Sequence, residues 1–172
     1  MNSAALMDLE KKYGAFNYHP IPVVLNRGEG IYVWDVEGRR YVDMLSNYSA
    51  FNFGYGHPRL IKAAEDQLIR LSGGSRAFYT DVYADFVESL AKFCFLDKVL
   101  PASGGAEAVE TAIKISRKWG YEVKGVEEDK AEIIVCDNNF HGRTTTIVGF
   151  SSTPQYKKGF GPFAPGFKSI PF

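Results

Sequence analysis

Two short segments of this 172-residue chain carry residue types that could bind a ligand. In the first, Ser103 to Ala108, two glycines stand directly before a stretch with helical periodicity. The first N–H groups of a helix have no partner within the helix, and glycines let an anion approach them closely. The segment therefore predicts a phosphate site, although an ordinary turn that needs glycine for a positive φ would show the same pattern.

The second segment, Asn139 to Thr144, follows a predicted buried strand and contains Phe140, Gly142 and Arg143. Gly142 permits a tight turn, and an arginine holds a carboxylate through two parallel hydrogen bonds. The alternatives are core packing for Phe140 and a surface ion pair for Arg143. Taken together, the two segments suggest a flat, phosphorylated cofactor beside a substrate that carries a carboxylate.

Two tyrosines, Tyr18 and Tyr48, lie in loops rich in glycine, proline, asparagine or serine. A tyrosine in such a loop lines a pocket with its ring and forms hydrogen bonds with its hydroxyl, or it packs against its own lobe. The three histidines, at positions 19, 57 and 141, fit no metal-binding spacing, so no metal site is expected.

The composition excludes several functional classes. Lys plus Arg and Asp plus Glu both number 20, so the formal net charge is zero and no nucleic-acid partner is expected. The sequence has neither an apolar run long enough to cross a bilayer nor a signal-peptide pattern, which favours a cytoplasmic protein without a membrane partner. Cys94 and Cys136 lie in apolar runs and are expected to be buried free thiols.

The pattern of apolar and turn residues also predicts the elements that position these side chains. In the first half it predicts a helix over residues 4–12, an antiparallel meander of strands over 23–26, 30–35 and 39–43, and helices over 58–71 and 81–94. In the second half it predicts strands over 98–101, 131–136 and from 168 onward, and helices over 106–119 and 144–151. Gly120 is expected to end the first of these two helices.

Strands that alternate with helices indicate a parallel sheet, so the fold class is α/β. We expect a small α+β lobe over residues 1–56 and the first part of a larger α/β domain over residues 57–172. A parallel sheet needs cover on both faces, and no helix is predicted after the last strand. We therefore expect these residues to be part of a longer protein.

Several motifs along the chain are long enough to be specific: Tyr13-Gly14-Ala15, Asn17-Tyr18-His19-Pro20, Gly30-Ile31-Tyr32, Trp34-Asp35-Val36-Glu37-Gly38, Ser75-Arg76-Ala77-Phe78-Tyr79, Glu107-Ala108, Glu110-Thr111-Ala112, Arg117-Lys118-Trp119-Gly120-Tyr121 and Phe160-Gly161-Pro162-Phe163. Through them the chain resembles, nearly end to end, the N-terminal part of the ornithine aminotransferases of the class III pyridoxal-phosphate (PLP) family. The resemblance implies a PLP-transferase fold of type I.

The resemblance also implies how the cofactor is held. The backbone of Gly105 and Ala106 would bind the PLP phosphate, and Phe140 would stack on the pyridine ring. The family commonly has serine or threonine where this chain has Gly104, so one hydroxyl donor to the phosphate is missing unless Ser103 replaces it. We therefore expect weaker retention of the cofactor.

For the substrate, the resemblance implies that Arg143 holds the α-carboxylate and that Tyr18 and Tyr48 line the pocket, with Tyr18 near the α-amino group of ornithine. This pair of tyrosines distinguishes the ornithine enzymes from their acetylornithine and GABA relatives. The activity implied is transfer of the δ-amino group of L-ornithine to 2-oxoglutarate by a homodimer, a step of proline and arginine metabolism. It yields glutamate and glutamate semialdehyde, which cyclises to pyrroline-5-carboxylate.

Members of this family are more than twice as long as the chain, and their Schiff-base lysine matches no lysine here. No catalytic residue is therefore assigned within residues 1–172, and these residues alone are expected to be inactive. Two alternatives stay open: a class III aminotransferase acting on acetylornithine or GABA, and a non-catalytic remnant or interaction protein.

Overall fold

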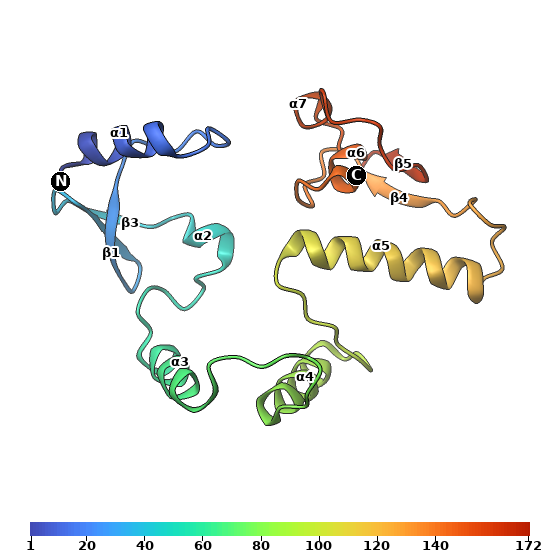
Figure 1. The fold of residues 1–172 in the computed structure, drawn as a ribbon, viewed down its shortest axis with the longest axis horizontal. Helices are drawn as coiled ribbons and strands as arrows, with labels where there is room; N and C mark the ends of the chain where they lie inside the picture. Colours follow the sequence, from blue (N-terminus) through green and yellow to red (C-terminus); the bar gives the residue numbers. More distant parts are fainter. The chain divides into compact units, whose positions relative to one another are not determined.

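The computed structural model describes residues 1–172, and Figure 1 shows the order of its elements. The helices and strands are α1 (Ser3–Tyr13), β1 (Leu25–Glu29), β2 (Tyr32–Asp35), β3 (Arg40–Val42), α2 (Ser46–Ser49), α3 (Pro58–Leu71), α4 (Asp81–Cys94), α5 (Gly105–Glu122), β4 (Ile133–Cys136), α6 (Thr145–Gly149), α7 (Pro154–Lys157) and β5 (Phe167–Ile170). They form two compact units, Met1–Thr80 and Asp81–Phe172. The predicted domain boundary after residue 56 stays a prediction.

The second unit contains the parallel pairing that the sequence predicts. Strands β4 and β5 run parallel, with Ile133 opposite Phe167 and Cys136 opposite Ile170. Helices α6 and α7 lie between them in the sequence, and α5 packs along the two strands (Figure 1). This βα arrangement confirms the α/β class for the second unit.

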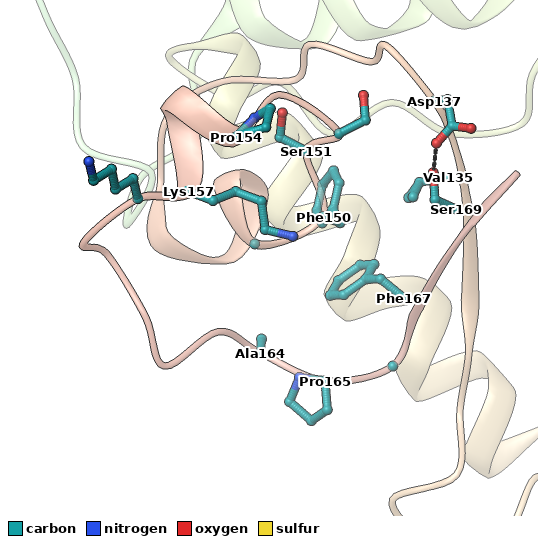
Figure 2. A pocket seen from close by; sticks show the side chains of 14 residues that line it. Val135, Asp137, Phe150, Ser151, Pro154, Lys157, Ala164, Pro165, Phe167 and Ser169 are labelled. Carbon is teal, nitrogen blue, oxygen red and sulfur yellow. Dashed lines mark hydrogen bonds between the residues drawn. The ribbon is translucent and has the colours of Figure 1, made fainter. Parts of the chain in front are cut away.

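A small apolar core joins these elements. It consists of buried side chains from α5, β4 and α6 with the residue after α6: Ile113, Val135, Ile147 and Phe150. The Phe150 ring lies 4.6 Å from the Phe167 ring of β5, and Figure 2 shows the two rings facing each other. Arg117 of α5 donates to the Pro165 carbonyl at 2.5 Å and so fixes the helix to the segment that enters β5.

Three sequence predictions in this unit are wrong. Residues 98–101 form no strand. Gly120 does not end α5, because it is buried inside the helix and Val126 folds back to donate its N–H to the Gly120 carbonyl at 3.0 Å. Cys94 is exposed rather than buried, since the last residues of α4 face outward, and Cys136 is half-buried; both are free thiols.

The first unit is built on the predicted meander. Strand β1 pairs antiparallel with β2, and β2 pairs antiparallel with β3. The first strand begins two residues later than the sequence predicts and includes Arg27–Glu29, which were expected to form the turn. The turn is instead made by Gly30 and Ile31, because Gly30 has a φ of 56° and Glu29 pairs with Tyr32.

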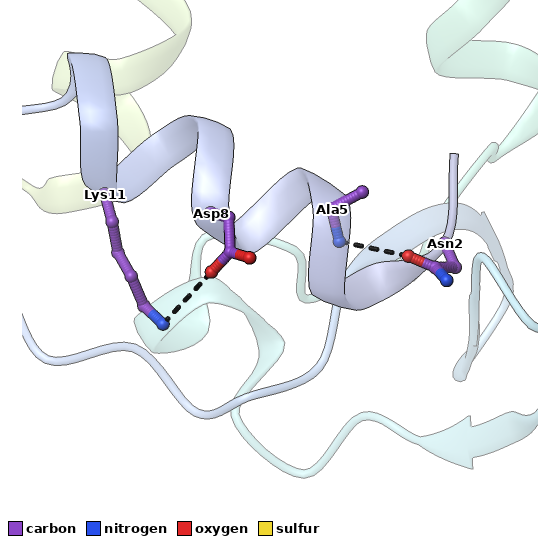
Figure 3. A network of polar contacts seen from close by, with 4 residues as sticks. All are labelled: Asn2, Ala5, Asp8 and Lys11. Atoms are coloured by element: carbon purple, nitrogen blue, oxygen red, sulfur yellow. Dashed lines mark hydrogen bonds and ion pairs between the residues drawn. The ribbon is translucent and has the colours of Figure 1, made fainter.

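Helix α1 has polar contacts at its start and an ion pair further along. Asn2 caps the helix by accepting the Ala5 N–H at 3.0 Å, and Lys11 pairs with Asp8 at 3.6 Å (Figure 3). Ser3 donates its N–H and its hydroxyl to the two carboxylate oxygens of Glu37, at 2.8 and 2.6 Å. The helix is therefore tied to the turn between β2 and β3.

Helices α3 and α4 have the bounds that the sequence predicts. Pro58 occupies the first turn of α3, where its missing N–H has no cost, and the apolar side chains recur at helical spacing. No helix in the structure combines the length and the apolar character needed to cross a membrane.

Helix α2 is a single turn with the opposite hand. Its four residues, Ser46 to Ser49, all have positive φ values of 51°, 47°, 55° and 70°, and none is glycine. Left-handed backbone costs an L-residue about 1–2 kcal/mol, so contacts outside the turn must hold it. The turn carries Tyr48, one of the predicted substrate residues.

A buried carboxylate stabilises the turn between β2 and β3. Asp35 is only 3% exposed and accepts hydrogen bonds from the Tyr41 hydroxyl at 2.7 Å and from the N–H groups of Arg39 and Glu37 at 2.8 and 3.0 Å. Burial raises the pKa of Asp35, but these bonds outweigh burial and leave the pKa below its ordinary value of 3.8. The folded state therefore favours the ionised carboxylate.

We expect Tyr41→Phe to lower the melting temperature by roughly 2–4 °C at neutral pH. Because the pKa of Asp35 is lowered, its stabilising contribution is present above 3.8 and is lost as the pH falls through the lowered value. The difference between wild type and variant should therefore narrow below pH 3.8. Thermal unfolding measured from neutral to acidic pH checks this, and a pH-independent difference would contradict it.

Candidate functional site

The predicted phosphate site lies at the first turn of α5. The helix begins at Gly105, and Gly104 occupies the N-cap position without a side-chain cap. Glu107 accepts the Ser103 N–H at 3.0 Å, so its carboxylate is engaged behind the turn. A Cβ placed on Gly104 or Gly105 would meet nothing within 4 Å, which leaves open space beside uncapped N–H groups. This donor set fits a phosphate group.

The second predicted segment is seated directly on this helix terminus. Gly142 has a φ of 131°, and a Cβ placed there would lie 2.8 Å from the Cβ of Ala106. The Thr144 hydroxyl donates to the Glu110 carboxylate of α5 at 2.5 Å and accepts the Ile147 N–H at 3.3 Å. The structure therefore brings the glycine turn and the Asn139–Thr144 segment together, although they are more than thirty residues apart in the sequence.

Phe140 and Arg143 stand on this seated segment. The Phe140 ring is 59% exposed and contacts the Tyr156 ring edge-on at 6.1 Å, so it is not a core residue. The Arg143 guanidinium lies 5.8 Å from the centre of the Phe140 ring. Asn139 fixes the start of the segment by donating to the Cys136 carbonyl at 2.6 Å. An accessible aromatic ring and an arginine are thus placed on the same loop.

Tyr18 and Tyr48 lie together in the first unit. Their hydroxyl oxygens are 2.5 Å apart, and their side chains are 51% and 71% exposed. The sequence predicts each tyrosine in its own loop, and the structure adds that the two form a hydrogen-bonded pair. Their role in binding a substrate stays a prediction.

Sequence reasoning missed the contacts that seat the loop, namely Thr144 with Glu110 and Gly142 with Ala106. A threonine before a short helix is an N-cap signal, but nothing in the pattern indicates its second partner 34 residues away.

A pocket of about 660 Å³ opens between α6, α7 and β5, lined by side chains that include Phe150, Lys157 and Ser169 (Figure 2). None of the predicted cofactor or substrate residues lines this pocket.

Comparisons with known proteins identify the family of this chain. The family model Aminotransferase class-III matches residues 13–172. The ornithine aminotransferase of Geobacillus sp. (strain WCH70) is 56% identical over 167 residues, which is 97% of this chain and 42% of that protein. A structure of the ornithine aminotransferase from Toxoplasma gondii, with partial occupancy of PLP at its active site, superposes with a TM-score of 0.97 at 41% identity. The match covers 99% of this chain and 40% of that one.

The acetylornithine aminotransferase from Elizabethkingia anophelis is also similar, with 54% identity, a TM-score of 0.83 and coverage of 99% of this chain and 41% of that one. The chain thus spans about two-fifths of the length of the relatives it matches. The family match over residues 13–172 shows that the chain belongs to the class-III aminotransferases, and the chain is similar along nearly its whole length to part of the ornithine aminotransferases compared.

Proposed function

We propose that the whole protein is a PLP-dependent ornithine δ-aminotransferase. It would transfer the δ-amino group of L-ornithine to 2-oxoglutarate and yield glutamate and glutamate semialdehyde, which cyclises to pyrroline-5-carboxylate. The observation that carries this proposal is the seating of Gly142 on Ala106, because it joins an open phosphate site to an exposed ring and an arginine. The ornithine aminotransferase relatives support the substrate.

Four residues would hold the cofactor. The N–H groups of Gly105 and Ala106 would donate to the phosphate next to Gly104, and the exposed Phe140 ring would cover the pyridine ring. When bound, PLP supplies an aldehyde that accepts an amino group and a ring that withdraws electrons. Residues of this chain would orient that ring and exclude water from one of its faces.

Three residues would bind the substrate. The Arg143 guanidinium would donate two parallel hydrogen bonds to the α-carboxylate of ornithine, and 2-oxoglutarate carries carboxylates of the same kind. The hydroxyl pair of Tyr18 and Tyr48 offers oxygen acceptors to the α-amino group, with Tyr18 proposed as the nearer. Holding the α-amino and carboxylate groups leaves the δ-amino group as the one presented for transfer.

The homodimer and the cytoplasmic location belong to the same proposal and rest on the family resemblance. Apolar side chains of α3 such as Leu68 and Ile69 are 61% and 86% exposed, which supports burial of this helix by further polypeptide.

Acetylornithine is the second candidate substrate, favoured by the 54% identity to the acetylornithine aminotransferase from Elizabethkingia anophelis. The experiment is a comparison of L-ornithine, N-acetylornithine and GABA as amino donors to 2-oxoglutarate, using the whole protein and detecting glutamate, the product that all three donors form from 2-oxoglutarate. We expect ornithine to be the preferred donor. Preference for N-acetylornithine would establish the second candidate, and no turnover of any donor would favour a non-catalytic role. A polypeptide of these 172 residues in the same assay tests the proposal that the lysine that forms the Schiff base with PLP lies outside them.

The missing hydroxyl at Gly104 leads to a prediction about cofactor retention. Gly104 has an extended backbone with a φ of −153° and room for a side chain, so serine fits there. A charge-assisted hydrogen bond contributes about 1.5–3 kcal/mol, so Gly104→Ser should lower the PLP dissociation constant roughly 10- to 150-fold. Gly104→Ala is the matched control, because it adds the Cβ without the hydroxyl. Equal PLP affinity in the serine and alanine variants, measured by cofactor absorbance during dialysis, would refute the prediction.

A further inference from the structure

The left-handed turn that carries Tyr48 is held from outside by one carboxylate. Asp43 follows β3 directly, and its Oδ1 accepts the N–H groups of Leu45 and Ser46 at 2.9 and 3.0 Å. These two bonds fix the backbone where it enters the strained turn. Beyond the end of the turn, the Phe51 N–H donates back to the Ser46 carbonyl at 3.1 Å. The Asp43 carboxylate is thus the side chain that sets the start of the turn.

The same carboxylate also binds the far end of the loop. Asp43 Oδ2 accepts the Tyr55 hydroxyl at 2.7 Å, so one side chain joins both ends of residues 44–54. Tyr55 is a rigid partner, since its N–H and carbonyl bond to Gly30 at 2.8 and 2.9 Å and its ring stacks on Phe51 at 4.9 Å. A Cβ placed on Gly28 would lie 2.5 Å from that ring, so the ring lies directly on the β1 backbone.

The three hydrogen bonds that Asp43 accepts are stronger when its carboxylate is ionised. The Tyr55 hydroxyl, followed by the Ser46 and Leu45 N–H groups, holds the pKa of Asp43 below its ordinary value. The same bond raises the pKa of the Tyr55 hydroxyl, which keeps the phenol protonated as the donor. We call the hydrogen bond from Tyr55 to Asp43 the clasp. Throughout the neutral pH range, its acceptor is a charged carboxylate and its donor a neutral phenol.

We propose that Asp43, through Tyr55, is a positioning residue that places the Tyr48 hydroxyl against Tyr18 and thereby sets recognition of the substrate α-amino group. The inference rests on the proposed function and deepens it. Asp43 does not contact the substrate in this scheme. It acts by holding four non-glycine residues in a left-handed turn whose third member, Tyr48, bonds to Tyr18 at 2.5 Å.

The test removes the clasp and measures selectivity for the α-amino group. Tyr55→Phe in the whole holoenzyme deletes the hydroxyl and keeps the ring that stacks on Phe51. Its substrates are L-ornithine and 5-aminopentanoate, which is ornithine without the α-amino group. We expect the ratio of kcat/KM for ornithine to that for 5-aminopentanoate to fall about 10-fold, mainly through a higher KM for ornithine. Asp43→Asn should lower the same ratio.

Tyr41→Phe is the matched control. Tyr41 donates to Asp35 at 2.7 Å, and Asp35 also accepts two backbone N–H groups, so the same hydroxyl is removed from an equivalent carboxylate elsewhere in the meander. A merely structural role would make the two phenylalanine variants alike in melting temperature and in selectivity. The proposal expects only Tyr55→Phe to change the selectivity.

A second arm keeps the proposal testable if Asp43→Asn fails to fold. In a Tyr48→Phe background, Tyr55→Phe should have no further effect on the ratio, because both changes act on the same hydroxyl contact. A full additional loss in the double variant, or an equal selectivity change in Tyr41→Phe, would overturn the proposal. A wild-type holoenzyme that is active but shows no preference for ornithine over 5-aminopentanoate overturns it too. A wild type that turns over neither amine refutes the proposed function, and this inference with it.

Discussion

Gly142→Ala is expected to release PLP from the whole protein while leaving most of the chain folded. The new Cβ would lie 2.8 Å from Ala106 Cβ and 3.3 Å from Ile147 Cδ1, and neither partner can move far because Ala106 is in α5 and Ile147 is buried. Overpacking of this kind costs about 1–3 kcal/mol, and a non-glycine residue at such a φ costs a similar amount. Moving the loop off α5 relieves both penalties.

If displacement of the loop relieves about 3 kcal/mol, the seated state required for binding becomes rare and the PLP dissociation constant rises roughly 100-fold. The measurement is cofactor absorbance after gel filtration, with thermal unfolding in parallel. Gly159→Ala is the control, since Gly159 also has a positive φ, 84°, but a Cβ there would meet nothing within 4 Å. Both variants should lose stability, and only Gly142→Ala should lose PLP. Retention of PLP by a destabilised Gly142→Ala protein would show that the site does not need the seated loop.

The same contact shows how far the sequence allows the site to be predicted. Glycines before a helix and an arginine after a strand are local patterns, so both segments of the candidate site can be named from residue type and spacing, while their binding roles stay predictions. Their meeting depends on Gly142 against Ala106 and on Thr144 with Glu110, and contacts at that separation leave no periodic pattern. The contact between Tyr18 and Tyr48 was unpredictable for the same reason, because the two tyrosines come from loops that are distant in the sequence.

The fold was predictable to a similar extent. The bounds of α3 and α4 follow from Pro58 and from apolar residues at helical spacing, which are local signals. Gly120 shows the limit, because a glycine can end a helix, yet here it is buried inside α5, which continues to Glu122. The left-handed turn at Ser46–Ser49 is unpredictable for a similar reason, since only Asn47 among its residues favours positive φ and Asp43 with Tyr55 holds the loop from outside.

Arg143→Lys should separate recognition of the substrate carboxylate from the rest of the site. Lysine keeps a positive charge near Phe140, whose ring centre is 5.8 Å from the guanidinium, but it cannot form two parallel bonds to a carboxylate. Loss of one charge-assisted bond amounts to about 1.5–3 kcal/mol, so kcat/KM for L-ornithine should fall roughly 10- to 150-fold. Steady-state kinetics of the whole protein, with PLP saturating, measure this.

The discriminating substrate is 1,4-diaminobutane, which is ornithine without its carboxylate. If Arg143 binds the carboxylate, wild type and Arg143→Lys should turn over this diamine with similar kcat/KM, because the contact that the substitution weakens is absent from the start. The preference of wild type for ornithine over the diamine should then fall in the variant by the same factor as kcat/KM for ornithine. An equal loss for both amines would mean that Arg143 acts through the Phe140 ring and the cofactor, since only those contacts are common to the two substrates.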